Sequence, residues 1–343
     1  MKKGQLTMQD IADKLGISKS TVSRALKDHP DISEKTKKAV MQLANELDFQ
    51  PNSLALSLRH NRSNIIGVIV PEIVHHFFAN VISGIQAVAY REGYNVMICL
   101  SNEDFDQEVK DAFALQTSRV DGILMSISKE TTDFEHLKKI HRKGTPIVFF
   151  DRACDEMDVS KVISDDFGGA FSATQHLIEQ GCKQVVHLAG PATLALSKSR
   201  KDGYLAALKE NGIAPDDNLI VECPAGTMED GEDKVNQLLA SGLKIDGIFA
   251  NNDIAAIGAM KAAKKHGLRI PEDIAVVGFS DWQIASIVDP ALSSVAQPGY
   301  EMGRIAAEKL LKEINADEDE VVPSMTSTIR SELVVRDSSL RKK

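Results

Sequence analysis

The sequence predicts an all-α N-terminal domain followed by a larger α/β body of doubly wound parallel sheets. A helix-turn-helix pattern over residues 7–26 indicates the helical domain. From residue 65 onward, short apolar runs alternate with helical patterns, which is typical of a doubly wound fold. The short apolar runs suit parallel strands that are buried on both faces.

Two short helices joined by a tight turn are expected first. Gly16 supplies the turn, and Ser18 is a suitable N-cap for the second helix. Apolar side chains fall on the inward faces, with Ala12 small enough for close packing: Ile11, Leu15, Ile17, Val22 and Leu26. The outward face of the second helix carries hydroxyls and cations, which can reach base edges and phosphates in a DNA major groove. An ordinary helical hairpin is the alternative interpretation.

A third helix is expected from Ser33, as N-cap, to about Leu47. Residues 1–63 contain eleven Lys and Arg against seven Asp and Glu, a balance of +4. The whole chain carries −9, so residues 64–343 carry −13. A basic N-terminal domain on an acidic body suits a protein that touches DNA phosphates with that domain alone.

The remaining elements alternate along the body. Strands are expected at residues 65–70, 95–100, 121–126, 147–151, 184–189, 219–222, 247–250 and 274–279. Helices are expected at about residues 77–92, 105–117, 134–143, 168–180, 197–211, 229–241, 254–266 and 301–314.

Composition narrows the class of protein. The 343 residues are 43% hydrophobic and 26% charged, as in a soluble globular protein. We expect no membrane segment and no secretory signal, because no apolar run of about 18 residues occurs and the N-terminus leads into a polar helix. The widely spaced Cys99, Cys154, Cys182 and Cys223 indicate free buried thiols in a reducing cytoplasm.

Several blocks of residues resemble the lactose-repressor family of bacterial transcription regulators. The blocks are Thr7-Met8-x-Asp10-Ile11-Ala12, Gly16-Ile17-Ser18-x-x-Thr21-Val22-Ser23-Arg24-x-Leu26, Ser33-Glu34-Lys35-Thr36, Phe49-Gln50-Pro51-Asn52, Ile66-Gly67-Val68, Asn251-Asn252-Asp253-x-x-Ala256-x-Gly258-Ala259 and Ile270-Pro271-Glu272-Asp273-Ile274-Ala275-Val276-Val277-Gly278-Phe279. They occur in the family's order and cover nearly the whole chain.

The resemblance implies a domain plan. A DNA-binding headpiece occupies residues 1–50, a hinge helix and linker 51–63, an effector-binding and dimerisation domain 64–336, and a short tail 337–343. The body is then similar to periplasmic sugar-binding proteins, with two doubly wound parallel-sheet subdomains. Subdomain one spans about 64–164 plus 293–323, and subdomain two about 165–292 plus 324–336. The chain crosses between them near residues 164–165, 290–293 and 322–324.

The same resemblance implies a homodimer on a near-palindromic operator in double-stranded DNA. We expect Lys19, Ser20 and Arg24 to read bases from the second helix. Hydroxyls at helix starts are expected mainly on phosphates: Thr7, Ser18, Thr21, Ser33 and Thr36. The C-terminus after residue 336 is too short for the coiled coil of the family's tetrameric member.

The hinge segment adds the DNA-binding candidates Asn52, Ala55 and Leu58. In the family, a leucine of each hinge helix wedges into the minor groove, and Leu58 occupies that position. Such a short helix does not persist alone in water, so a disordered linker is the expectation without DNA. Leu56 departs from the family, in which many members carry a polar or basic residue there.

A ligand site is expected beyond the carboxyl ends of the strands. Arginine guanidinium groups, carboxylates and amides beside aromatic rings there suit a polyhydroxylated effector such as a sugar or sugar derivative. The candidates are Phe77, Phe78, Asp151, Arg152, Arg200, Asn252, Asp253, Ser280, Asp281 and Trp282. Asn252 and Arg200 are placed by their resemblance to effector-binding residues of the family. Many relatives have Asp at the position of Ser280, so no known sugar specificity transfers.

Six of these candidates have a second interpretation. Asp253 caps the helix that follows, Arg200 belongs to a surface ion pair, and Phe77 and Phe78 are core residues. Asp151 and Arg152 alternatively pair between the subdomains.

Three classes of protein compete for this chain. We expect a cytoplasmic transcription regulator, acting as a repressor, with no cofactor. A solute-binding protein of a transport system would need a secretion signal and no headpiece. An enzyme would need a nucleophile–base pair, a phosphate loop or a metal set, none of which is evident. The adjacent His75 and His76 lack a third metal ligand at suitable spacing.

Overall fold

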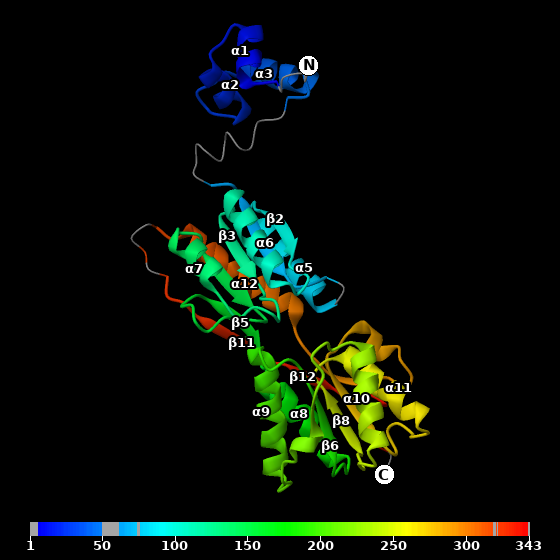
Figure 1. The fold of residues 1–343 in the computed structure, drawn as a ribbon. Helices are drawn as coiled ribbons and strands as arrows, with labels where there is room; N and C mark the ends of the chain where they lie inside the picture. The colour runs from blue at the N-terminus through cyan, green and yellow to red at the C-terminus, as the bar shows by residue number, and fades with distance from the viewer. Residues whose placement is uncertain (1–5, 50–61, 74–75, 318–319, 321, 342–343) are drawn as a thin grey trace. The chain divides into compact units, whose positions relative to one another are not determined.

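The computed structural model describes residues 6–49, 62–73, 76–317, 320 and 322–341. The chain forms two compact units, residues 1–63 and 64–343 (Figure 1). The hinge candidates Asn52, Ala55 and Leu58 lie outside the described residues, as does His75.

The described part of the first unit contains three helices, α1 (Met8–Leu15), α2 (Lys19–Leu26) and α3 (Glu34–Glu46). Gly16 ends α1 with a φ of 64°, a left-handed conformation that glycine adopts at little cost. The side chains of Ser18 and Ser33 accept hydrogen bonds from the backbone N–H groups of Thr21 and Thr36, as N-caps do. A small apolar core joins the helices through Ile11, Ala12, Val22, Ala25, Val40 and Ala44.

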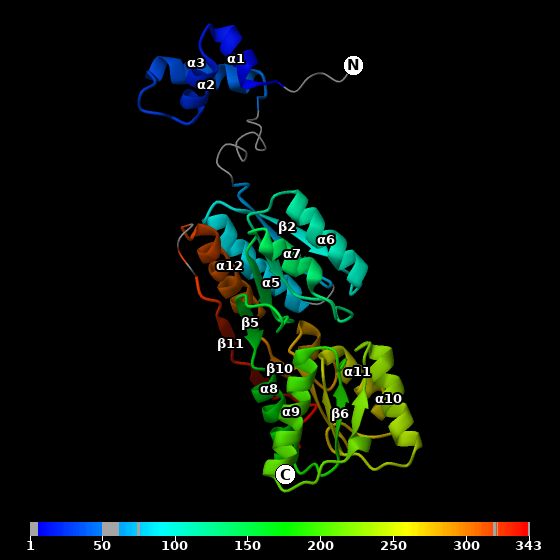
Figure 2. The ribbon, with the colours of Figure 1, turned by 60° about the vertical axis from the view of Figure 1, so that its left-hand side comes forward.

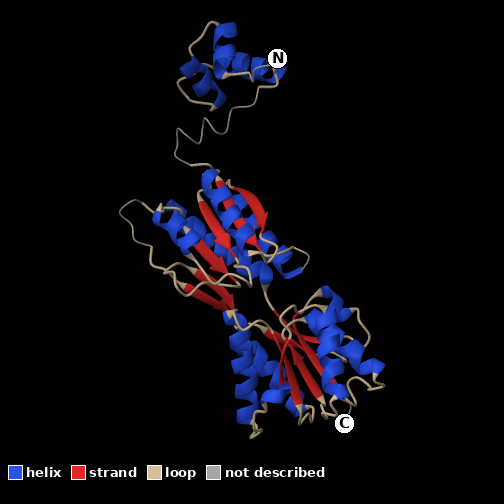
Figure 3. Cartoon of the chain, in the orientation of Figure 1, coloured by secondary structure: helices blue, strands red, loops and turns tan. Residues whose placement is uncertain are grey.

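The second unit contains two six-stranded sheets within the described residues (Figure 3). The first sheet has the order β11-β5-β4-β3-β1-β2 and the second β12-β10-β9-β8-β6-β7. The first comprises β1 (Ile65–Val70), β2 (Asn95–Leu100), β3 (Gly122–Met125), β4 (Ile147–Phe150), β5 (Lys161–Ser164) and β11 (Thr326–Ile329). The second comprises β6 (Val185–Ala189), β7 (Ile220–Glu222), β8 (Gly247–Ala250), β9 (Ala275–Ser280), β10 (Ser293–Ala296) and β12 (Glu332–Val334).

Helices cover both faces of each sheet. On the first sheet, α5 (His76–Arg91) and α12 (Gly299–Asn315) pack on one face, and α6 (Phe105–Thr117) and α7 (Glu135–Arg142) on the other (Figure 2). On the second sheet, α8 (Asp166–Glu179) and α9 (Ala195–Glu210) pack on one face, and α10 (Met228–Ala240) and α11 (Asp253–Lys265) on the other. Short 3-10 helices occur at Asp217–Leu219 and Gln283–Ser286.

Both sheets are parallel except at one edge, where β12 pairs antiparallel with β10. Strands β1, β3, β4, β6 and β8 are buried nearly throughout, as expected for strands covered on both faces. The predicted fold class, an all-α headpiece on a doubly wound α/β body, is confirmed.

The chain crosses between the two sheets at three places, and two lie later than expected. The first, after Ser164, is where the sequence placed it. The second follows β10, at residues 297–298 instead of 290–293, and the third lies at residues 330–331 instead of 322–324. The displacement arises because β10 belongs to the second sheet and β11 to the first.

The segment expected as a tail packs against subdomain two. Ser338 and Ser339 are fully buried, and the backbone N–H of Val276 donates to the Ser338 carbonyl. The Arg341 guanidinium donates to the carbonyl oxygens of Pro271 and Asp246. These residues therefore extend subdomain two.

Candidate functional site

The outward face of α2 presents the base-reading candidates. Lys19, Ser20 and Arg24 are exposed, whereas Val22 and Ala25 on the opposite face are buried. Three side chains of one helix thus point to solvent from a short, capped and packed element.

The hydroxyls expected on phosphates also stabilise helix starts. Thr7 forms a capping box with Asp10, and the Ser18 Oγ accepts the Thr21 N–H at 3.1 Å. Ser18 also bonds the Thr21 and Ser20 hydroxyls, and the Ser33 Oγ bonds the Thr36 hydroxyl at 2.8 Å. These groups lie where the N–H groups of a helix start attract an anion.

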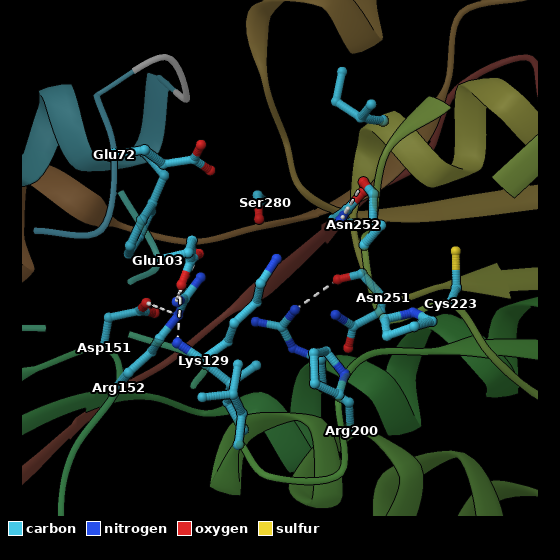
Figure 4. A pocket seen from close by; sticks show the side chains of 18 of the residues that line it. Glu72, Glu103, Lys129, Asp151, Arg152, Arg200, Cys223, Asn251, Asn252 and Ser280 are labelled. Carbon is cyan, nitrogen blue, oxygen red and sulfur yellow. Dashed lines mark hydrogen bonds and ion pairs between the residues drawn. The ribbon is translucent and has the colours of Figure 1, made fainter. Parts of the chain in front are cut away.

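A pocket in the body gathers eight of the ten ligand candidates (Figure 4). Its lining includes Phe77, Phe78, Asp151, Arg152, Arg200, Asn252, Ser280 and Trp282. These residues follow or adjoin strands of both sheets, so the pocket lies between the two subdomains. Phe77 and Phe78 are buried as well as lining, with their rings edge to face at 5.3 Å.

Arg200, on α9, is held by contacts within subdomain two. Its Nε and Nη2 lie 2.8 and 2.7 Å from the Asp166 Oδ1, and its Nη1 donates to the Asn251 carbonyl at 2.6 Å. The guanidinium also stacks on the Phe279 ring, 3.7 Å from the centroid. Burial raises the pKa of the Asp166 carboxyl, and the Arg200 charge opposes this rise. The ion pair that the sequence allowed for Arg200 therefore exists, but it is buried.

Arg152 pairs within subdomain one. Its Nη1 donates to both carboxylate oxygens of Glu103, at 2.9 and 2.8 Å, so the contact is not the pairing between subdomains that was the alternative. Asp151, beside it, has a φ of 58° and is nearly buried. Its carboxylate accepts no hydrogen bond from the described residues, and burial raises its pKa to about 6.

Asn252 lines the pocket as expected, and it, rather than Asp253, caps the helix that follows. The N-cap of α11 is Asn252, whose Oδ1 accepts the Ala255 N–H at 2.8 Å while its Nδ2 donates to the Gly226 carbonyl. Gly226 has a φ of 63°, and a Cβ there would lie 2.6 Å from the Asn252 Nδ2, so glycine is required. Asp253 lies below the pocket surface, where its carboxylate accepts from the Trp282 N–H and the Ser294 hydroxyl.

Asp281 also lies outside the pocket lining. Its carboxylate forms an ion pair with Arg336 at 2.6 Å. The expectation that Asp253 and Asp281 line the ligand site is not met, because both carboxylates turn toward partners within subdomain two.

Ser280 joins a hydrogen-bonded chain at the subdomain crossings. Its hydroxyl donates to the Gln297 Oε1 at 2.8 Å, and the Gln297 Nε2 donates to the Ser164 hydroxyl at 3.1 Å. Ser164 ends β5, and Gln297 begins the second crossing. A side chain of the pocket lining is thereby linked to two of the three connections.

The pocket also contains residues that the sequence did not predict. Glu103 and Lys129 follow β2 and β3, whose carboxyl ends obey the same rule that identified Asp151 after β4. Glu72, Asn251 and Gln297 line it as well. Extending the strand-end rule to every strand finds Glu103 and Lys129, whereas no local signal identifies Gln297.

The described residues show no sign of a metal site, a disulfide or a membrane span. No group of three or more His, Cys, Asp or Glu side chains is arranged to hold a metal ion. The four cysteines are free, and burial raises the pKa of the Cys182 and Cys223 thiols to about 12. No helix in this part of the chain has the length and apolar character needed to span a membrane.

Comparison with known families decides the identity. Residues 63–331 match the periplasmic binding proteins and sugar binding domain of the LacI family, and residues 7–52 match the bacterial regulatory proteins of the lacI family. The chain belongs to the lacI family. It is 34% identical to the ribose operon repressor of Halalkalibacterium halodurans over 97% of each chain. It is 33% identical to the transcriptional repressor CytR of Escherichia coli K12, over 97% of this chain and 96% of CytR.

Solved structures of lacI-family proteins share the fold. The Lac repressor dimer bound to operator and the anti-inducer ONPF matches with a TM-score of 0.86 and 25% identity, covering 98% of this chain and 99% of that chain. The complex of the regulator CelR with cellobiose matches with a TM-score of 0.74 and 28% identity, covering 97% and 99%. This lacI-family chain is a DNA-binding transcriptional regulator with an effector-binding body, and not an enzyme.

Proposed function

We propose that this regulator is a cytoplasmic, nucleoid-associated homodimeric repressor whose operator affinity is set by a sugar or sugar derivative in the pocket between its subdomains. One observation carries the proposal. The same chain has an exposed, N-capped recognition helix and a pocket that combines aromatic side chains with polar groups. The structures of the Lac repressor dimer on operator and of CelR with cellobiose support this assignment.

On the DNA side, Lys19, Ser20 and Arg24 read bases, and the hydroxyls at helix starts position the headpiece on phosphates. Two headpieces of a dimer then face two half-sites. The segment 51–63, with Asn52, Ala55 and Leu58, connects headpiece and body and contacts the minor groove between the half-sites.

On the effector side, Phe77, Phe78 and Trp282 cover the apolar face of the sugar, while Asp151, Arg200 and Asn252 bind its hydroxyls. The ligand binds the protein more tightly at one degree of subdomain closure than at another. This difference shifts the equilibrium that segment 51–63 transmits to the headpieces. A coupling of roughly 1–3 kcal/mol changes operator affinity about 5- to 150-fold.

Arg24→Ala tests the DNA side. Operators are selected from random duplex DNA with the wild-type chain, and affinity is then measured by fluorescence anisotropy over a range of salt. We expect Arg24→Ala to cost about 1–3 kcal/mol and to relax the preference at one base position. Arg142→Ala, which removes an exposed charge from α7, serves as the matched control. Unchanged affinity and base preference in Arg24→Ala would refute the assignment of this helix.

A further inference from the structure

The cationic side chains that line the pocket differ in whether they already form ion pairs or hydrogen bonds with other residues. Arg152 is bound to both oxygens of Glu103, and Arg200 is bound to Asp166 and to the Asn251 carbonyl. Lys129 differs, because its ammonium forms no ion pair or hydrogen bond with any residue that the structure describes. Figure 4 shows its side chain reaching into the space between Arg152 and Arg200.

The backbone beneath Lys129 is fixed. Its N–H donates to the Glu103 Oε2 at 2.8 Å, and its carbonyl accepts from the Thr193 hydroxyl at 3.1 Å. The preceding Ser128 is fully buried, and its N–H donates to the buried Glu108 carboxylate at 2.7 Å. The ammonium is therefore carried on an ordered loop, and it lies in the pocket without a partner among the described residues.

The remaining donors of the pocket point to the same ligand chemistry. An arginine has five N–H groups, and the contacts of Arg200 use three of them. One N–H of the Asn252 amide is used by the Gly226 carbonyl, which leaves a second. Together with the three N–H groups of Lys129, these donors, which no described residue uses, suit a ligand group that concentrates several acceptor lone pairs, as a carboxylate or phosphate does.

The lining also contains the acidic Glu72, Glu103 and Asp151, so the charge available around Lys129 depends on which carboxylates are already paired. The Glu103 and Asp166 carboxylates are already paired with arginines. Ser280 contributes a neutral hydroxyl, and no carboxylate, to the lining. Asp151 lies beside the Arg152–Glu103 pair, away from the end of the Lys129 side chain (Figure 4).

We infer that the effector of this regulator is an anionic carbohydrate whose carboxylate or phosphate group binds the Lys129 ammonium. The inference rests on the proposed function, because it names the class of sugar that the same pocket takes. Lys129 binds the anionic group and the Arg200 N–H groups assist it. Asp151 and Asn252 remain available to the sugar hydroxyls.

Matched pairs of probes test this inference. The full-length chain is titrated by calorimetry and thermal shift with galacturonate against galactose, glucuronate against glucose, and glucose 6-phosphate against glucose. We expect one acid to bind about 10- to 100-fold more tightly than its neutral partner, the range for a hydrogen-bonded charge. Comparing the uronates with glucose 6-phosphate shows whether the pocket prefers a carboxylate or a phosphate group. Acetate and inorganic phosphate measure binding of the anionic group without a sugar.

Variants attribute the preference to one residue. Lys129→Met should reduce the preference for the acid to within about threefold, while Lys129→Arg keeps most of it. Lys198→Met removes an exposed lysine of α9 outside the pocket lining and should bind as the wild type does.

Equal binding of the acid and its neutral partner overturns the inference, as does an undiminished preference in Lys129→Met. Binding of only neutral sugars, or of no acidic probe, overturns it too. A neutral sugar that releases the operator would still support the proposed function, so the two failures are distinguishable.

Discussion

The two subdomains contribute to the pocket in different ways. Subdomain two supplies Arg200, Asn252 and Ser280, and each already bonds a protein partner. Subdomain one supplies Lys129, whose ammonium has no partner among the described residues, and Asp151, whose carboxylate accepts no hydrogen bond from them. The pocket side chains of subdomain two are therefore held by internal bonds, whereas subdomain one adds Lys129 and Asp151 to its own bonded Arg152–Glu103 pair. We predict that these two groups of subdomain one set ligand specificity.

The largest expected effect follows from the buried Arg200–Asp166 pair, whose side chains are only 5% and 7% exposed. Arg200→Ala leaves the Asp166 carboxylate buried and unpaired, so the free energy of unfolding should fall by about 3–5 kcal/mol. Denaturant unfolding measures this loss. Replacing Asp166 by Ala as well should recover part of it. The more exposed Arg152–Glu103 pair is the control, and an equal loss in Arg152→Ala would contradict the comparison.

The next effect is a pH-dependent change in stability caused by Asp151 of subdomain one. Burial raises the pKa of the Asp151 carboxyl from 3.8 to about 6 in the folded chain, which therefore holds this proton more tightly than the unfolded chain. The carboxyl costs stability progressively as the pH rises from about 4 to about 6, and the full cost persists above that range. Asp151→Asn removes the cost, and asparagine also tolerates the φ of 58°.

We expect ligand-free Asp151→Asn to exceed the wild type by about 1–3 kcal/mol in unfolding free energy at about pH 7.5. The two proteins should be nearly equal at about pH 4. Denaturant unfolding at both pH values checks this. A constant difference at the two pH values would show that the titration of Asp151 is not the cause.

A smaller effect is expected at the cap of α11. Asn252→Ala removes the acceptor for the Ala255 N–H and should lower the unfolding free energy by about 1 kcal/mol. Asn252→Asp keeps the acceptor but loses the donor to the Gly226 carbonyl. If Asn252→Asp is less stable than Asn252→Ala, the cap is not the main contribution of this residue.

The smallest effect is expected at the subdomain crossings. Ser280→Ala removes one hydrogen bond to Gln297 and should cost about 0.5–1.5 kcal/mol. Ser294→Ala, which removes the bond to the buried Asp253, should cost more. A greater loss of stability in Ser280→Ala than in Ser294→Ala would show that the bond at the crossing contributes more than the bond to Asp253 beneath the pocket.

Local signals predicted much of the fold. The helix at residues 105–117 has the bounds expected, and Ser18 and Ser33 are N-caps as predicted. The crossings were harder to predict, since β11 and β12 are short and partly exposed, and β10 begins with two buried serines. Such strands lack the apolar run that marks β1 or β4.

Within the pocket, the strand-end rule and the family resemblance together found eight lining residues but not their partners. It gave Asp151 and Arg152 after β4 but omitted Glu103 and Lys129, because the ends of β2 and β3 were not considered. It also counted Asp253 and Asp281, whose neighbours are in the lining, although both carboxylates turn inward. Position along a strand indicates the edge of the sheet, and the partners of a side chain determine its direction.

The sequence by itself determined the N-caps of the second and third helices, the headpiece core, the alternation of the body and the family. Each depends on residues a few positions apart, whose hydrogen bonds and periodic burial form within one element. Only the tertiary structure decided the pairing of Arg200 with Asp166, of Arg152 with Glu103 and of Gln297 with Ser164, across 34, 49 and 133 residues. These contacts depend on where the topology brings distant strand ends. The Lys129 charge, which no described residue pairs, therefore becomes apparent only in the folded body.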